Sequence, residues 1–167
     1  MGIDPKAEVA ARQMLGHAIL SDAEALASAI RAAPGATVAG VIDLCVLAAG
    51  YVAVEACGHW PGQADLRALA HRGAQSVTRQ DASEEEIFEF LARVTFGDGT
   101  ARETASDEDA ASVPLHAVAS LLLAFCPQGM EWPEYLDRIW TAYKAAEMID
   151  ESVLPALTFQ ARRAASG

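Results

Sequence analysis

The sequence predicts an all-α protein, and three observations support this fold class. Alanine, which has the highest helix propensity, supplies 36 of the 167 residues. Aromatic residues make up 7% of the chain and runs of Val, Ile and Thr are few, so strand-forming patterns are sparse. Apolar residues make up 52%, enough to form a buried core. We therefore expect one helical domain over residues 1–167, a bundle of about seven or eight helices.

Capping signals place the first two helices. Asp4 followed by Pro5 begins a helix that runs to about Leu20, because proline suits the first helical position. Residues 21–24, Ser-Asp-Ala-Glu, have the pattern of a capping box, in which the serine caps one backbone N–H and the glutamate reaches back to another. A second helix then ends at Pro34-Gly35. One bent helix is the alternative, because the same residues are tolerated inside a helix.

The most apolar segment is residues 38–57, VAGVIDLCVLAAGYVAVEAC. As a helix it would span about 30 Å, the thickness of the hydrocarbon core of a bilayer. It contains Asp43 and Glu55, however, and no cluster of Lys or Arg flanks it. A carboxylate near the centre of a bilayer costs about 2.5–3.5 kcal/mol, so we reject a membrane span. We predict instead the buried central helix of the bundle, at about residues 38–58.

The second half of the chain contains further helices with clear start signals. Residues 83–86, Ser-Glu-Glu-Glu, form a second capping box, and Pro114 begins a very apolar helix. We expect these helices at about residues 64–79, 83–97, 114–126 and 132–149, with a short last helix near Pro155 that carries Leu157 and Phe159.

The negative charge is concentrated in one region. The formal net charge is −11, and residues 81–109 carry ten acidic and two basic residues. This segment would repel phosphate, so we expect neither nucleic acid nor a membrane as a partner. A basic protein could bind it; the alternative is a solvated surface that keeps the chain soluble. Residues 98–111, which overlap the end of this segment, lack apolar periodicity, and we interpret them as a mobile acidic loop.

The compartment is predicted from the N-terminus and the cysteines. Residues 1–15 carry charges where a signal peptide would be apolar. The three cysteines lack metal-type spacing, and Cys45 and Cys57 would lie about 18 Å apart on one helix, too far for a disulfide. These features favour the cytoplasm, where thiols stay reduced.

Glu55 and His59 are the nearest approach to a metal site. They lie four residues apart, on one helix face, where a carboxylate and an imidazole can share a metal. A metal needs further ligands that the sequence does not place beside them. A simple Glu–His pair near a helix end is the alternative interpretation.

Asp43 and His116 are candidate ligand-binding residues. Asp43 falls within the predicted buried helix, where an unpaired charge is costly, so we expect it to be buried and paired. His116 lies in the first turn of an apolar helix. If an apolar cavity lies beside either residue, the chain could be a small-molecule sensor or a minimal enzyme. The alternative is a structural role for both.

No motif predicts catalysis or a cofactor. The sequence contains no phosphate-binding loop, no G-x-S-x-G and no dinucleotide fingerprint. Residues 69–79 loosely match a helix-turn-helix, but a surface helix with arginines explains them equally well. We therefore expect a non-enzymatic protein without a cofactor.

Four aromatic residues favour a homodimer. Trp132, Tyr135, Trp140 and Tyr143 fall within twelve positions of one predicted helix. At 100° per residue they cannot share one stripe, and Tyr135 lies on a different face from Trp140. Aromatic rings left outside the core are enriched at protein interfaces, so we predict self-association through this helix. The alternatives are that Tyr135 simply lies on the surface, or that neighbouring helices cover both faces.

The acidic loop provides the first testable prediction. We expect limited proteolysis of the native protein to cleave first within residues 98–111, because a solvated segment without large apolar residues reaches a protease without unfolding of the core. Mass spectrometry of the fragments locates the cut. Protection of this segment under conditions that cleave elsewhere would contradict the interpretation.

Overall fold

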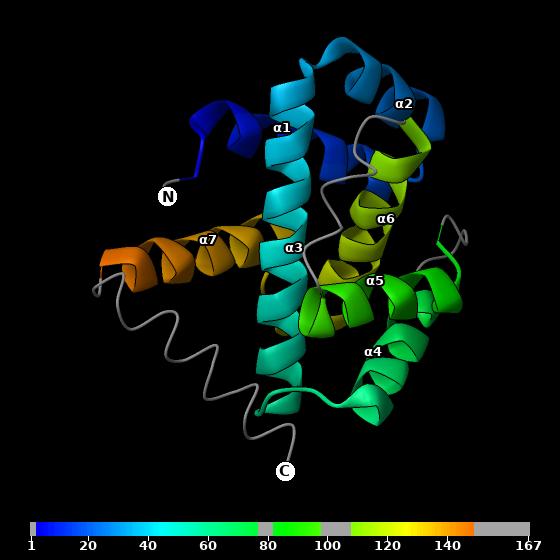
Figure 1. Cartoon of the computed structure of the whole chain (residues 1–167), viewed down its shortest axis with the longest axis vertical. Coiled ribbons are helices and arrows are strands. Elements are labelled where there is room, and N and C mark those ends of the chain that lie inside the picture. Colours follow the sequence, from blue (N-terminus) through cyan, green and yellow to red (C-terminus); the bar gives the residue numbers. More distant parts are fainter. Residues whose placement is uncertain (1–2, 77–81, 98–107, 149–167) are drawn as a thin grey trace.

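A computed structural model gives the structure of the protein and describes residues 3–76, 82–97 and 108–148 (Figure 1). Within these ranges the chain forms seven α-helices and no strand, so the predicted all-α class is confirmed. The short helix expected near Pro155 lies outside the described residues. The helices are α1 (Pro5–Ile19), α2 (Ala23–Ala32), α3 (Gly35–Cys57), α4 (Gln63–Gln75), α5 (Glu84–Phe96), α6 (Glu108–Phe125) and α7 (Trp132–Met148).

The longest helix, α3, lies in the middle of the bundle. It packs against α1, α4, α5, α6 and α7; in Figure 1, α4 to α6 lie on one side of it and α7 projects on the other. It begins at Gly35, three residues before the expected start, and ends where Gly58 takes a φ of 71°, the left-handed conformation that favours glycine after a helix. About half of its most apolar stretch is buried. The other described helices therefore cover one side of this central helix only in part.

Local capping explains most of the helix boundaries. Asp4 accepts a hydrogen bond from the backbone N–H of Lys6 and begins α1. The capping box at Ser83 is confirmed, because its hydroxyl and the Glu86 carboxylate each accept from the other residue's backbone N–H. The box predicted at Ser21 is wrong by one residue. Ser21 takes a left-handed φ of 54° in the turn between α1 and α2, so Asp22 becomes the cap and accepts from the N–H of Ala25.

Helix α6 begins six residues before the predicted start. Pro114 lies inside the helix, which already includes residues 108–111 of the expected acidic loop. Proline removes only one backbone hydrogen bond at this point, and Ala111 and Leu115, four residues apart, are both fully buried on the inner face. Packing of that face outweighs the local helix-breaking tendency. Residues 98–107 of the expected loop lie outside the described residues.

Charged side chains connect the two ends of the described chain. Arg12 on α1 binds Asp137 on α7, and its guanidinium lies 4.7 Å from the ring centre of Trp140. Lys144 Nζ lies 3.2 Å from Glu8 Oε2. These contacts join α7 to α1 and help to set the direction in which α7 crosses the bundle.

The contact between α1 and α3 provides a prediction about packing. A Cβ added at Gly40 would lie 2.7 Å from the Cβ of buried Ala7, so the two helices must separate to admit it. We expect Gly40→Ala to lower the free energy of unfolding by about 1–3 kcal/mol. The measurement is urea denaturation followed by the circular dichroism of the helices.

Gly50→Ala in the same helix is the matched control. An added Cβ there meets only Val94 Cγ1, at an ordinary contact distance of 3.6 Å. This substitution should stabilise α3 by up to about 1 kcal/mol through helix propensity. Equal stability of the two variants would contradict the close approach at Gly40.

Candidate functional site

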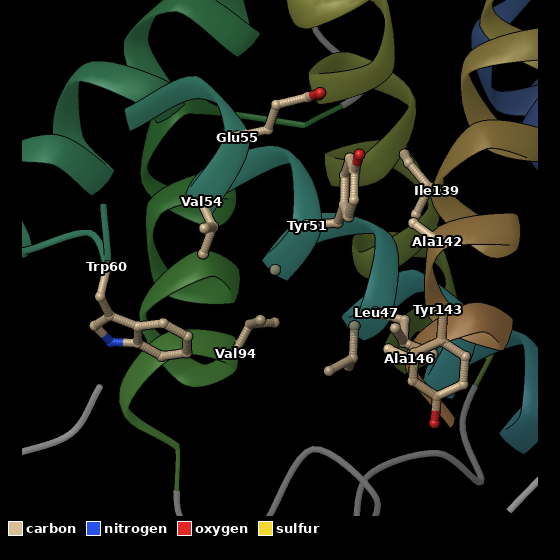
Figure 2. Close-up of a pocket in the computed structure, with 12 residues that line it drawn as sticks. Leu47, Tyr51, Val54, Glu55, Trp60, Val94, Ile139, Ala142, Tyr143 and Ala146 are labelled. Atoms are coloured by element: carbon tan, nitrogen blue, oxygen red, sulfur yellow. The ribbon is translucent and has the colours of Figure 1, made fainter. Parts of the chain in front are cut away.

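An open apolar groove runs along the uncovered side of α3, between α5 and α7. Its volume is about 680 Å³. Helix α3 forms the floor, while α5 and the loop after α3 form one wall and the last turns of α7 form the other (Figure 2). The lining residues are Val46, Leu47, Gly50, Tyr51, Val54, Glu55, Trp60, Val94, Ile139, Ala142, Tyr143 and Ala146.

Helical spacing explains why α3 presents this floor. Leu47, Gly50 and Val54 are three or four residues apart and therefore lie along one stripe of the helix. Gly50 contributes no side chain, which hollows the centre of the stripe, and Val94 of α5 packs beside that point. Val54 leaves 37% of its surface exposed. In Figure 2 the indole of Trp60 and the ring of Tyr143 lie on opposite sides of this stripe.

A polar cluster fixes one end of the groove. Glu55 Oε2 accepts a hydrogen bond of 2.5 Å from the buried Tyr135 hydroxyl, and Glu55 Oε1 accepts one of 2.6 Å from Arg138. Tyr51 also forms a hydrogen bond with Arg138. Burial, and then the Glu55 carboxylate, raises the pKa of Tyr135 well above its ordinary value. The same carboxylate is the main cause of the raised pKa of Arg138. This cluster holds α7 against α3.

The structure does not bring together the predicted metal-ligand pair. Glu55 binds residues of α7, whereas His59 Nε2 lies 3.1 Å from Asp65 Oδ2 at the start of α4. The backbone N–H of Gly62 and the His59 side chain lower the pKa of Asp65. In the described part of the chain, no group of three or more His, Cys, Asp or Glu residues could hold a metal ion.

The prediction that Asp43 is buried is wrong. Its position on α3 is exposed, because the helices around α3 leave this side uncovered. Asp43 lies one turn before Leu47 on the same stripe, beyond the end of the groove, and does not line it. His116 is partly buried on α6 and likewise does not line the groove. A ligand-binding role for either residue remains a prediction.

Two of the four aromatic residues of α7, Tyr135 and Trp140, are not left over from the core, as the sequence argument for a dimer required. Tyr135 and Trp140 are each 1% exposed. Helices α3 and α6 pack against α7, and the Arg12 side chain of α1 lies over the ring of Trp140. Glu55 provides the partner that the Tyr135 hydroxyl needs inside the protein. Trp132 and Tyr143 are partly buried, and of the four residues only Tyr143 lines the groove. Tyr135 and Trp140 are therefore covered within the chain itself, and self-association through this helix remains a prediction.

Sequence reasoning missed the groove. The segment 38–57 is apolar on all sides, so its pattern does not indicate which stripe the other helices leave open. Trp60 follows this segment closely in the sequence. An aromatic residue in a turn beside an apolar helix is the one local signal that could have pointed to this site.

Comparisons with protein-family models, curated proteins and solved structures find no match to this chain.

Among the described helices, α3 is the one that is long and apolar enough to cross a membrane, by length and composition alone. About half of that stretch is buried against other helices, and a core helix of a soluble protein has the same features.

The cluster at Glu55 predicts how stability depends on pH. Because the pKa of Tyr135 is raised on folding, its contribution to stability is complete below its ordinary pKa of 10.0 and decreases as the pH rises beyond that value. Tyr135→Phe should lower the free energy of unfolding by about 1–2 kcal/mol near neutral pH. The loss should shrink above about pH 10, where the unfolded wild-type chain ionises.

Urea unfolding of both proteins at about pH 8 and about pH 10.5 measures this difference. Comparison at each pH removes the titration of other groups, which the two proteins share. An equal loss at the two pH values would contradict a neutral, hydrogen-bonded Tyr135.

Proposed function

We propose that this chain is a non-enzymatic interaction protein that binds a second copy of itself through the groove between α3, α5 and α7. The observation that carries the proposal is the apolar, open character of that groove, in which Glu55 is the one carboxylate among the described lining residues. We also propose that the protein is located in the cytoplasm, where thiols stay reduced, because Cys45, Cys57 and Cys126 are free thiols.

The chemistry of the lining favours binding over catalysis. Glu55 is held by Tyr135 and Arg138, so it is not poised to transfer a proton to a bound molecule. Among the described residues that line the groove there is no histidine, cysteine, serine or lysine. General acid–base or nucleophilic catalysis would need such a group beside the substrate.

The shape and residue types of the groove favour a protein partner. The groove is open along its length and has Tyr51, Trp60 and Tyr143 among its lining residues. Tyrosine and tryptophan are enriched among the residues that dominate binding at protein interfaces. An apolar helix that lies in such a groove makes contacts at intervals of three or four residues, which matches the stripe along α3.

A second copy is compatible with the charge of the chain. The net charge of −11 opposes self-association, but Arg138 neutralises the one carboxylate of the groove. Charges farther from the contact are screened over about 8 Å at physiological ionic strength. Self-association should therefore strengthen with added salt, whereas contact with a basic protein through residues 81–109 would weaken.

A small apolar ligand is the second candidate, and the volume favours it. About 680 Å³ lies within the range of small-molecule sites, roughly 300–1,000 Å³. Saturable binding of an apolar fluorescent dye by a monomeric chain, lost in Val54→Glu, would support this candidate over self-association.

Self-association is tested by sedimentation velocity across a concentration series. Val54→Glu places a carboxylate in the groove, and burial of that charge at an interface should weaken the dimer at least about tenfold. Leu123→Glu is the matched control, because Leu123 is 38% exposed on α6, outside the groove lining, and Val54 is 37% exposed. Both variants change the net charge equally.

A dimer that survives Val54→Glu, or a wild-type protein that stays monomeric at the highest concentration, would overturn the proposal. Circular dichroism of each variant confirms that the helices are retained.

A further inference from the structure

We propose that two ion pairs between α1 and α7 hold the groove open, because they keep the last turns of α7 away from the floor on α3. The two pairs, called here the α1–α7 ion pairs, are Arg12–Asp137 and Glu8–Lys144. This inference rests on the proposed function and describes how residues outside the groove control binding in it.

The α1–α7 ion pairs lie along one face of each helix. Asp137 and Lys144 are seven residues apart, which places them two turns apart on one face of α7. Glu8 and Arg12 are four residues apart and share a face of α1, and Arg12 Nη2 lies 3.5 Å from Glu8 Oε1. The four charged groups therefore form one network where the two helices meet. None of the four is among the described residues that line the groove.

The wall of the groove is the opposite face of α7. Its last turns contribute Ala142, Tyr143 and Ala146 to the lining. At 100° per residue, the centre of this stripe lies roughly 160° around the helix from Asp137 and Lys144. In Figure 1, the first turns of α1 and the last turns of α7 lie on the same side of α3. Attachment of α7 to α1 on one face therefore keeps its other face at a distance from α3.

The last turns of α7 can move without exposure of the core. In the first half of the helix, Leu136 and Ile139 are fully buried and Trp140 is 1% exposed. Described residues 141–146, in contrast, are partly buried or exposed. Long helices curve gently, so a displacement of these last turns needs no break in the helix.

The physical chemistry of the groove favours closure when the ion pairs are absent. Floor and wall are both apolar and face each other across an open space of about 680 Å³. Contact between them would remove apolar surface from water, which is favourable. The described contacts that oppose this movement are on the far face of α7. Exposed ion pairs contribute little to overall stability, so their removal should close the groove and leave the fold intact.

The test removes the charges of α7 without a change in net charge. The variant with Asp137→Asn and Lys144→Met loses one negative and one positive group, so the chain keeps its formal charge of −11. The matched control, Lys6→Met with Glu24→Gln, makes the same exchange at exposed positions of α1 and α2. Asp137→Glu with Lys144→Arg retains both charges and should behave as the wild type.

Two measurements on the full chain follow the groove. Sedimentation velocity across a concentration series measures self-association. Hydroxyl-radical footprinting of dilute, dissociated protein, read by mass spectrometry, measures the exposure of Leu47 on the floor and Tyr143 on the wall. In the charge-removed variant we expect at least about tenfold weaker association and a loss of oxidation at both residues, because they then cover each other. Both quantities should keep their wild-type values in the control and in the charge-retaining variant.

Stability separates closure of the groove from simple damage to α7. The circular dichroism and the urea midpoint of the charge-removed variant should equal those of the wild type, whereas loss of α7 from the bundle would lower the midpoint. If the double substitution prevents folding, Lys144→Met compared with Lys6→Met should lower the oxidation in the same direction.

Other results would contradict the inference or the proposed function separately. Unchanged oxidation of Leu47 and Tyr143 in the charge-removed variant would overturn the inference. Increased oxidation of Tyr143 would also overturn it, because the ion pairs would then hold α7 on the bundle. If oxidation falls while self-association is unchanged, the ion pairs do hold the groove open, but the second copy binds elsewhere and the proposed function is wrong. A monomeric wild-type protein contradicts the proposed function, and footprinting still tests the ion pairs.

Discussion

Helix α3 carries apolar residues on every side over its 23 residues, with Asp43 and Glu55 as its charged residues, and the packing of the other helices follows from the need to cover it. Helices α1, α4, α5, α6 and α7 all contact it. Removal of apolar surface from water stabilises the fold by about 25 cal/mol per Å², so each contact with α3 contributes directly to folding. Five helices still leave one stripe open, and this stripe, from Leu47 to Val54, is the floor of the groove.

The direction of α7 determines whether that stripe becomes a groove or a flat surface. The buried Tyr135 hydroxyl and Arg138 both bind Glu55, which joins the start of α7 to the end of α3. On the other side of α7, Arg12 binds Asp137 and covers Trp140. Held at its first half by these contacts, α7 extends across the bundle, and its last turns form a wall beside α3. The polar cluster of Glu55, Tyr135 and Arg138 therefore positions α7, which forms one wall of the apolar groove.

The predictions for single residues were wrong where burial or pairing depended on which helix surfaces pack against each other. Asp43 was expected to be buried because its neighbours in the sequence are apolar, yet it lies on the exposed stripe of α3. Tyr135 was expected to remain outside the core because it lies on a different face of α7 from Trp140, yet both are buried. Glu55 and His59 share a helix face by spacing, but stronger partners on α7 and α4 separate them. In each case the local sequence pattern was used to predict burial or pairing, which the neighbouring helix decides.

The sequence by itself determined the fold class and most of the helix boundaries. Alanine content, apolar periodicity and the caps at Asp4 and Ser83 act within a few residues, so they can be recognised without knowledge of the tertiary structure. Only the tertiary structure decided that Pro114 lies inside α6, which stripe of α3 is open and that Trp60 and Tyr143 line one groove. The physical reason is that burial is a long-range property. A side chain is covered or exposed according to which distant helices pack against it, and an apolar pattern that surrounds a helix does not specify where those helices lie.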